Sequence, residues 1–271
     1  MTGPSAAYPL GGTETEKQRL LKQAKTYEPL AGWLLDQIGI QSGWRAVDIG
    51  CGPIGILDLL SDRVGPQGSV VGLEREPRFV EMAREEISKR GLSNATVVEA
   101  DALSTGLEKG SFDLAHERLV LINVRAREAF LSEMMSLLRP GGTILLEDVD
   151  NVSWLCQPAH RSWDVLLGAF HTVFHDSGGD GFIGRRLPEL LRGAGVRNIQ
   201  TKVNVDILQI GDYRRTHLVS LIDSVRDKVI GAGLLNEKEL DEHREALASH
   251  LADPATTVIE KLLIQSWGQK L

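Results

Sequence analysis

Apolar residues in the first half of the chain form short, nearly continuous runs that alternate with longer amphipathic stretches. The runs have the length of β-strands and read WRAVDIG, SVVGLERE, ATVVEADAL, FDLAHERLVL and TILLEDVD. The stretches between them, such as ILDLLSDRVG and RFVEMAREEISKRG, space their apolar residues at three- and four-residue steps and predict helices. Continuous apolar runs are typical of parallel strands covered on both faces. The pattern therefore predicts an α/β fold with a doubly wound, mostly parallel sheet. With one further run in each of residues 186–211 and 253–271, the expected sheet is seven-stranded.

The N-terminal part of the chain predicts a helical addition to this sheet. Residues 1–12 look irregular, and the following stretch up to Gly39 has a helical pattern with a break expected near Pro29. We divide the chain into an N-terminal helical arm or cap over residues 1–44 and a ligand-binding βα core over residues 45–150. Because no repeat or low-complexity linker separates these parts, we expect one domain over residues 1–271.

The strand–helix alternation stops after Asp150. Residues 151–185 and 212–252 show no strand pattern, so we expect both segments to be helical and to form a cap. Residues 186–211 and 253–271 contain further apolar runs that predict the remaining strands and one helix. The amphipathic helices of the second cap segment have mixed charges and favour a cap or homodimer surface over a membrane anchor.

Composition narrows the classes of protein that the chain can represent. Its 271 residues are 42% hydrophobic and 25% charged, with 30 basic and 37 acidic side chains and a net charge of −7. These values are typical of a soluble globular protein and disfavour a nucleic acid as main partner. Two cysteines, Cys51 and Cys156, are too few for a disulfide framework. Since no signal peptide or membrane-length apolar run is evident, we expect a cytoplasmic protein without a membrane partner.

The glycine-rich sequence VDIGCGPIG lies where the first predicted strand turns into a helix. Glycine permits backbone conformations and a close ligand approach that a Cβ atom would prevent, and the helix N-terminus offers N–H groups to an anion. Gly50, Cys51 and Gly52 are therefore candidate ligand-binding residues. The spacing also satisfies the GxGxxG pattern of dinucleotide-binding proteins, so an NAD-dependent oxidoreductase remains an alternative, as does a turn that serves packing alone.

Three carboxylates follow or end successive predicted strands. Asp48 lies just before the first glycine, Glu74 ends the second strand, and Asp101 ends the third. Their positions suit an ammonium group, a pair of ribose hydroxyls and an adenine amino group, respectively. Together they predict a ligand that contains all three groups.

These motifs resemble those of class I S-adenosylmethionine-dependent methyltransferases. VDIGCGPIG resembles the first family motif, Glu74 the acid of strand 2, ADAL the strand-3 motif, FDLAHERLVL the fourth, and LLRPGGTILLED the segment entering strand 5. GDGFIGRRLPELLRGAGV and EKQRLLKQA are similar to segments of a bacterial group that methylates small molecules. One position departs from the pattern, because the family usually has glycine where Ile54 stands. A branched side chain there must point away from the cofactor.

The resemblance implies S-adenosyl-L-methionine as cofactor and assigns roles to several residues. Asp48, Gly50 and Gly52 would hold the methionine end, Glu74 the ribose, and Asp101 with Ala102 the adenine. His116, just after the fourth strand, would lie beside the methionine and face the acceptor. The full set of expected cofactor-binding residues is Asp48, Gly50, Cys51, Gly52, Glu74, Arg75, Asp101, Ala102 and His116.

The expected reaction is in-line displacement of the methyl group onto a small organic acceptor, most readily at oxygen, with nitrogen and carbon as alternatives. A general base is needed only for an acceptor that arrives protonated. His171 and His175 lie four residues apart in AFHTVFHDSG, on one helix face, and are the candidate catalytic residues. Surface or packed histidines without a catalytic role remain an alternative. We expect no metal, since no HExxH pattern accompanies them. A protein of this fold that binds the cofactor without transferring methyl also stays open.

Overall fold

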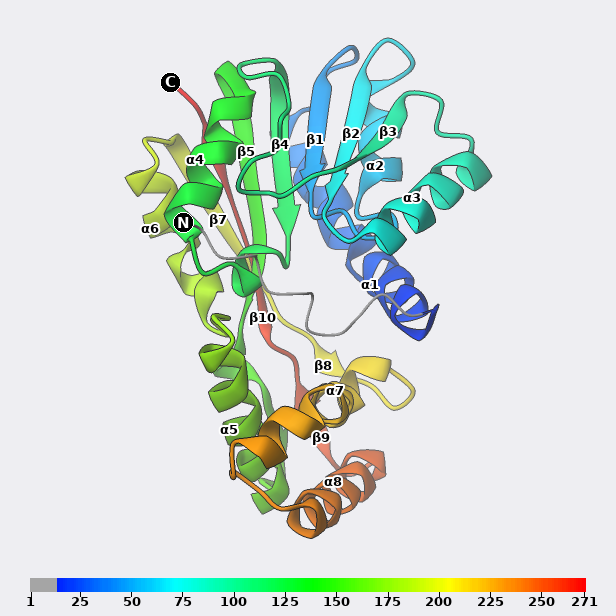
Figure 1. Ribbon diagram of the computed structural model, residues 1–271, viewed down its shortest axis with the longest axis vertical. Coiled ribbons are helices and arrows are strands. Elements are labelled where there is room, and N and C mark those ends of the chain that lie inside the picture. Colours follow the sequence, from blue (N-terminus) through cyan, green and yellow to red (C-terminus); the bar gives the residue numbers. More distant parts are fainter. Residues whose placement is uncertain (1–13) are drawn as a thin grey trace. The chain divides into compact units, whose positions relative to one another are not determined.

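The computed structural model describes residues 14–271 and divides into two compact units (Figure 1). The irregular arm expected over residues 1–12 lies outside the described residues. Unit 1 comprises the chain up to Asp148, Arg186–Lys202 and Gln265–Leu271, whereas unit 2 comprises Val149–Arg185 and Val203–Ile264. The ligand-binding core expected from the sequence falls almost entirely in unit 1. The expected cap segments 151–185 and 212–252 both fall entirely in unit 2.

A seven-stranded sheet with the order β3-β2-β1-β4-β5-β10-β7 organises the fold. Its strands are β1 (Arg45–Ile49), β2 (Ser69–Glu74), β3 (Ala95–Glu99), β4 (Phe112–Arg118), β5 (Leu138–Asp150), β7 (Arg197–Asn204) and β10 (Leu262–Gln269). The neighbours from β3 to β5 pair in parallel. The predicted α/β fold with a mostly parallel seven-stranded sheet is confirmed, and the carboxyl ends of β1, β2 and β3 meet at one edge.

Helices precede or connect the strands of this sheet, as the three- and four-residue spacing predicts. They are α1 (Glu14–Ile38), α2 (Leu57–Val64), α3 (Pro77–Arg90), α4 (Arg127–Leu137) and α6 (Leu187–Gly193), with short 3-10 turns at η1 (Leu121–Asn123) and η3 (Ile183–Arg186). The expected break near Pro29 is wrong, because α1 continues through it. Tyr27, Ala31 and Leu34 are buried on this helix, and their burial offsets the hydrogen bond that proline cannot donate.

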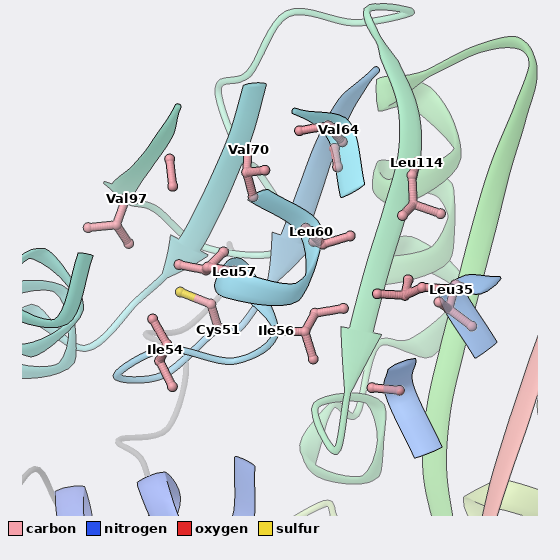
Figure 2. Packing of buried hydrophobic residues seen from close by; sticks show 14 of the residues in the cluster. Leu35, Cys51, Ile54, Ile56, Leu57, Leu60, Val64, Val70, Val97 and Leu114 are labelled. Carbon is pink, nitrogen blue, oxygen red and sulfur yellow. The ribbon is translucent and has the colours of Figure 1, made fainter. Parts of the chain in front are cut away.

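The core of unit 1 forms where the glycine-rich turn and α2 meet the sheet (Figure 2). Ile54, Ile56 and Leu57 are buried there together with Val70 of β2 and Leu114 of β4. Ile54 is thus part of the apolar core. This burial explains how a branched side chain is accommodated in a glycine-rich turn.

Unit 2 combines helices with a second small sheet. Its helices are α5 (Arg161–Asp176), α7 (His217–Gly231) and α8 (Glu237–Ala252), with 3-10 turns at η2 (Asn151–Ser153) and η4 (Tyr213–Thr216). β6 (Leu155–Gln157), β9 (Thr257–Ile259) and β8 (Ile207–Leu208) pair in antiparallel fashion. The absence of strands expected for residues 151–185 is therefore wrong. A three-residue strand is too short to show periodicity, and its partners lie far away in the sequence.

Over residues 14–271, none of the helices combines the length and the apolar character that a membrane span needs.

Gly55 provides a test of the glycine-rich turn. Its φ is +53°, and a Cβ atom there would lie 2.1 Å from Oδ2 of Asp48. We expect Gly55→Ala to lower the free energy of unfolding by more than about 1 kcal/mol, because left-handed strain and steric overlap add. The measurement is a urea unfolding curve.

Gly106→Ala is the matched control for this variant. Gly106 has a φ of +68°, and no atom of the described residues lies within 4 Å of a Cβ placed there. It therefore retains the backbone strain without the overlap, and its loss should be the smaller one. Equal losses in the two variants would contradict the close approach at Asp48.

Candidate functional site

The turn between β1 and α2 is held against the end of β2. The N–H groups of Gly50 and Cys51 both donate to the carbonyl of Leu73, at 2.6 and 3.1 Å. Gly50 and Gly52 have φ values of +71° and +54°, which favour glycine. A Cβ on Gly50 would lie 2.4 Å from Val120, whereas one on Gly52 would lie 3.8 Å from the nearest described atom. Gly52 therefore leaves space beside the backbone where a ligand can approach.

Cys51 contributes to this turn through its backbone. Its side chain is buried in the core of unit 1, and burial raises the pKa of the thiol well above its ordinary value. The thiol is therefore protonated and directed to the apolar core. Any contact of Cys51 with a ligand must come from its main chain.

A fully buried histidine joins β1, β4 and β5. His116 is 0% exposed, with Nδ1 2.7 Å from Oδ1 of Asp48 and Nε2 2.9 Å from Oε1 of Glu147. The other oxygen of Glu147 accepts a hydrogen bond from Gln265 at 2.8 Å, and Oδ2 of Asp48 accepts one from the N–H of Ile56 at 3.1 Å. Since both ring nitrogens face carboxylates, the ring donates from both as an imidazolium.

The electrostatics of this cluster fix its charge. Burial alone would lower the pKa of His116, but the charge and hydrogen bond of Asp48, together with Glu147, raise the pKa to about 9. Burial likewise opposes ionisation of Glu147, yet the hydrogen bond from His116 keeps the pKa of this carboxyl below its ordinary value. Asp48, His116 and Glu147 therefore carry one net negative charge.

The sequence placed His116 just after the fourth strand and facing an acceptor. It lies within β4, and both of its nitrogens are taken by carboxylates. Asp48, expected to meet an ammonium group directly, is buried beneath the turn. The two residues therefore support the glycine-rich turn from its buried side.

Glu74 occupies the last position of β2, beside the glycine turn. Its carboxylate accepts hydrogen bonds from the N–H groups of Gly52 at 3.0 Å, Arg75 at 2.8 Å and Glu76 at 2.9 Å. Burial raises the pKa of Glu74, and these N–H donors partly counter that rise. The carboxylate is thereby oriented by three backbone donors. Arg75 itself is exposed.

Asp101 lies two residues beyond β3 at the same edge of the sheet. Its Oδ1 accepts a hydrogen bond from the N–H of Leu103 at 2.8 Å, which closes a tight turn around Ala102. Both Asp101 and Ala102 are partly exposed. The topology therefore brings Asp48, Glu74 and Asp101 to one sheet edge, as the sequence predicts for neighbouring parallel strands.

Arg118, at the end of β4, is a candidate that the sequence analysis missed. Its Nη2 donates to the carbonyl of Gly55 at 3.3 Å, and the guanidinium lies 5.8 Å from the ring centre of Tyr27. Its Nη1 is buried without a hydrogen-bond partner among the described residues. A buried cationic donor left open in this way suits an anionic ligand group. The available signal was a basic residue at the end of the predicted strand FDLAHER.

His171 and His175 lie together on α5 in unit 2 but have different surroundings. His171 is half-buried, its Nε2 lies 2.9 Å from Nδ2 of Asn151, and burial lowers its pKa, so the ring is neutral at pH 7. The side chain of His175 is 85% exposed, with Nδ1 3.7 Å from the carboxylate of Asp176. The two rings therefore do not form one catalytic pair. Across residues 14–271, no group of three or more His, Cys, Asp or Glu side chains is placed to hold a metal ion.

Comparison with known proteins assigns the family. Residues 40–195, more than half of the chain, match the family model described as "Methyltransferase domain". The chain belongs to this family.

Individual relatives match over shorter stretches. The chain is 30% identical over 115 residues to a demethylmenaquinone methyltransferase of Geobacillus kaustophilus, covering 42% of this chain and 49% of that one. It is 33% identical over 118 residues to the aklanonic acid methyltransferase DauC of Streptomyces sp., covering 44% and 54%. The chain thus spans about half the length of the curated relatives that it matches.

A solved structure shares the fold at low sequence identity. It is a Haemonchus contortus phosphoethanolamine N-methyltransferase in complex with phosphomonomethylethanolamine and S-adenosylhomocysteine. The TM-score is 0.54 at 17% identity, over 87% of this chain and 51% of that one. This likeness shows the fold alone.

The charge of His116 can be measured directly. We expect its ¹⁵N resonances to report a doubly protonated ring at pH 7, with a titration midpoint near pH 9. Because the folded-state pKa lies above the ordinary value of 6.5, the ion pairs stabilise the fold by roughly 3 kcal/mol below pH 6.5, and this stabilisation is lost as the pH rises through 9. His116→Gln identifies the resonances, and a midpoint near 6.5 would contradict the charged cluster.

Proposed function

We propose that this protein transfers the methyl group of S-adenosylmethionine to a small organic acceptor, at oxygen. The observation that carries the proposal is the meeting of a glycine turn with the acids Asp48, Glu74 and Asp101 at one edge of a parallel sheet. Membership of the methyltransferase domain family supports it. The same membership speaks against the NAD-dependent alternative that the GxGxxG spacing left open.

The residues at this edge fit the cofactor group by group. Gly52 leaves room for close approach, and the net negative charge of the Asp48–His116–Glu147 cluster lies beneath the turn, where it would attract the cationic methionine end. Arg118 would pair its open Nη1 with the methionine carboxylate. S-adenosylmethionine supplies a methyl group on a positively charged sulfur, already activated for displacement.

The remaining acids would hold the nucleoside. Glu74 is fixed by three backbone N–H groups and would accept hydrogen bonds from ribose hydroxyls. Asp101 and Ala102 form a partly exposed turn that would receive the adenine. In this arrangement the protein mainly orients the reacting groups and excludes water.

A neutral His171 is compatible with an oxygen acceptor. A hydroxyl must lose its proton during methylation, and a neutral imidazole has an unprotonated nitrogen that can take it. His175 is less suited than His171 to act as the base, because its ring is exposed to water. The names of the relatives, which refer to demethylmenaquinone and aklanonic acid, support an organic molecule as acceptor.

Cofactor binding is tested with Glu74→Ala. We expect the affinity for S-adenosylhomocysteine, measured by calorimetry, to fall by about 1–3 kcal/mol, because charge-assisted hydrogen bonds to the ribose are lost. NAD titrated alongside should show no binding.

The matched control is Glu99→Ala, since Glu99 pairs in register with Glu74 at the end of the neighbouring strand β3 and is exposed. It removes the same charge from the same edge and should bind like the wild type. Unchanged affinity in Glu74→Ala, or binding of NAD alone, would overturn the assignment.

The base is tested with His171→Asn. Release of S-adenosylhomocysteine should slow about 10²- to 10⁴-fold with hydroxyl acceptors, the usual contribution of a general base. The affinity for S-adenosylhomocysteine should not change. Thr172→Ala, an exposed change at the next position of α5, serves as control. Undiminished turnover in His171→Asn would remove this residue from the mechanism, whereas cofactor binding without turnover on any acceptor would indicate a binding protein.

A further inference from the structure

The first turn of unit 2 contains two buried polar atoms that the fold does not satisfy. Asn151 is 6% exposed and Trp154 is 3% exposed. The backbone N–H of Trp154 donates to the carbonyl of Asn151 at 3.1 Å, so both residues belong to one turn. Within residues 14–271, neither Oδ1 of Asn151 nor Nε1 of Trp154 has a hydrogen-bond partner. Buried polar atoms are nearly always paired, so two unpaired ones on a single turn indicate a missing ligand.

The amide of Asn151 is fixed in place. Its Nδ2 lies 2.9 Å from Nε2 of His171, and its backbone N–H donates to the carbonyl of Gly181 at 2.9 Å. A Cβ on Gly181 would lie 2.6 Å from the amide nitrogen, so the amide could not keep this position beside a larger residue. In either orientation of the amide, one atom faces His171 and the other stays unpaired. The unpaired atom is therefore held ready for a polar group.

A buried cation lies beside Trp154. Lys261 is 9% exposed, and its Nζ lies 4.3 Å from the ring centre of Trp154 and 3.3 Å from Nδ1 of His217. The charge of Lys261 also acts on His171. Burial is the main cause that lowers the pKa of His171, and the positive charge of Lys261 is the second. The turn, α5 and the start of α7 thus surround one ammonium group.

We propose that Asn151, Trp154, His171, His217 and Lys261, the Trp154 cluster, bind the ionised oxygen of an aromatic acceptor, either a carboxylate or a phenolate. The ammonium and the indole N–H are both donors, which favours an anionic oxygen. The unpaired amide oxygen of Asn151 would accept from a neighbouring hydroxyl. The proposal rests on the proposed function, because it identifies this ligand with the methyl acceptor.

Aromatic side chains beside the cluster explain why the ligand should be aromatic. The ring of Phe182 lies 5.2 Å from that of His171 and is 37% exposed, and the guanidinium of Arg185 lies 5.1 Å from its ring centre. Phe170 lies on the other side of His171, with 6.0 Å between the ring centres. Binding sites for small molecules combine apolar walls with a few polar groups in this way.

A purely structural role explains the cluster less well. Trp154 packs against Trp163 with 5.5 Å between ring centres, which a phenylalanine could also do. The buried indole N–H has no hydrogen-bond partner among the described residues, so it adds a desolvation cost that a phenylalanine would not have. The neighbouring acid, Glu260, accepts a hydrogen bond from the backbone of Lys261, and its other oxygen lies 3.9 Å from Nε of Arg214. The charges of Lys261 and Arg214 both lower the pKa of Glu260 against the rise that burial causes, so its carboxylate interacts with two cations.

The test measures ligand binding apart from catalysis. Protein saturated with S-adenosylhomocysteine is titrated by calorimetry with salicylate as the carboxylate probe, 4-nitrocatechol as the phenolate probe and methyl salicylate as the neutral probe. The variants are Lys261→Met, Lys261→Arg and Trp154→Phe. Trp163→Phe is the matched control, because it removes an indole of equal size from the same core. Thermal melting and binding of S-adenosylhomocysteine establish that each variant is folded.

We expect one of the two anions to bind the wild type at least tenfold more tightly than methyl salicylate. Lys261→Met should abolish this preference, Lys261→Arg should retain it in part, and Trp154→Phe should weaken the anion three- to tenfold. Trp163→Phe should stay within twofold of the wild type. The tighter anion tells whether the ionised group is a carboxylate or a phenolate.

Two results overturn the proposal. One is failure of both anions to bind a wild type that binds S-adenosylhomocysteine, and the other is an anion affinity that Lys261→Met leaves unchanged. The proposed function fails separately, when no acceptor is methylated although the anions bind in a Lys261-dependent manner. If neutral acceptors are methylated equally well by the wild type and by Lys261→Met, the proposed function is supported and the anion site is refuted.

Discussion

The hydrogen-bonded cluster of Asp48, His116 and Glu147 is the constraint on which unit 1 depends. It joins three neighbouring strands of the sheet through side chains that water does not reach. Removing one partner from a buried, paired charge leaves the others uncompensated, at a cost of about 3–5 kcal/mol. A protein that needed only stability could fill this space with apolar side chains. We therefore infer that these buried charges serve the adjacent glycine-rich turn. Asp48 also fixes the start of α2 by accepting a hydrogen bond from the N–H of Ile56.

The same turn shows how packing and function share a short segment. Its glycines allow the backbone to fold back onto the end of β2, while Ile54 enters the apolar core. Glu74 closes the arrangement from the next strand by accepting the N–H of Gly52. The side of the turn that faces the core is therefore tightly filled, whereas Gly52 keeps the other side free for a ligand.

Unit 2 differs from unit 1 in the polar groups that it buries. Its helices pack around an apolar core of its own, and the polar atoms of Asn151, Trp154 and Lys261 lie within or beside that core. Burying such groups costs free energy unless they find partners. Unit 1 pairs His116 between two carboxylates but also leaves a buried donor open, Nη1 of Arg118. In unit 2 the unpaired atoms of Asn151 and Trp154 lie on one turn. This grouping is why we propose that unit 2 recognises the acceptor.

The sequence by itself determined the sheet and the edge at which its acids gather. Continuous apolar runs and glycine-rich turns are local signals, and the rule that parallel strands end at one edge brings Asp48, Glu74 and Asp101 together without coordinates. The tertiary structure alone decided the environment of each side chain. That His116 is an imidazolium between two carboxylates, that Arg118 keeps an open donor, and that α1 continues through Pro29 all depend on contacts distant in sequence. So does the small sheet of unit 2. Burial and charge pairing are properties of the packed molecule, and no local pattern encodes them.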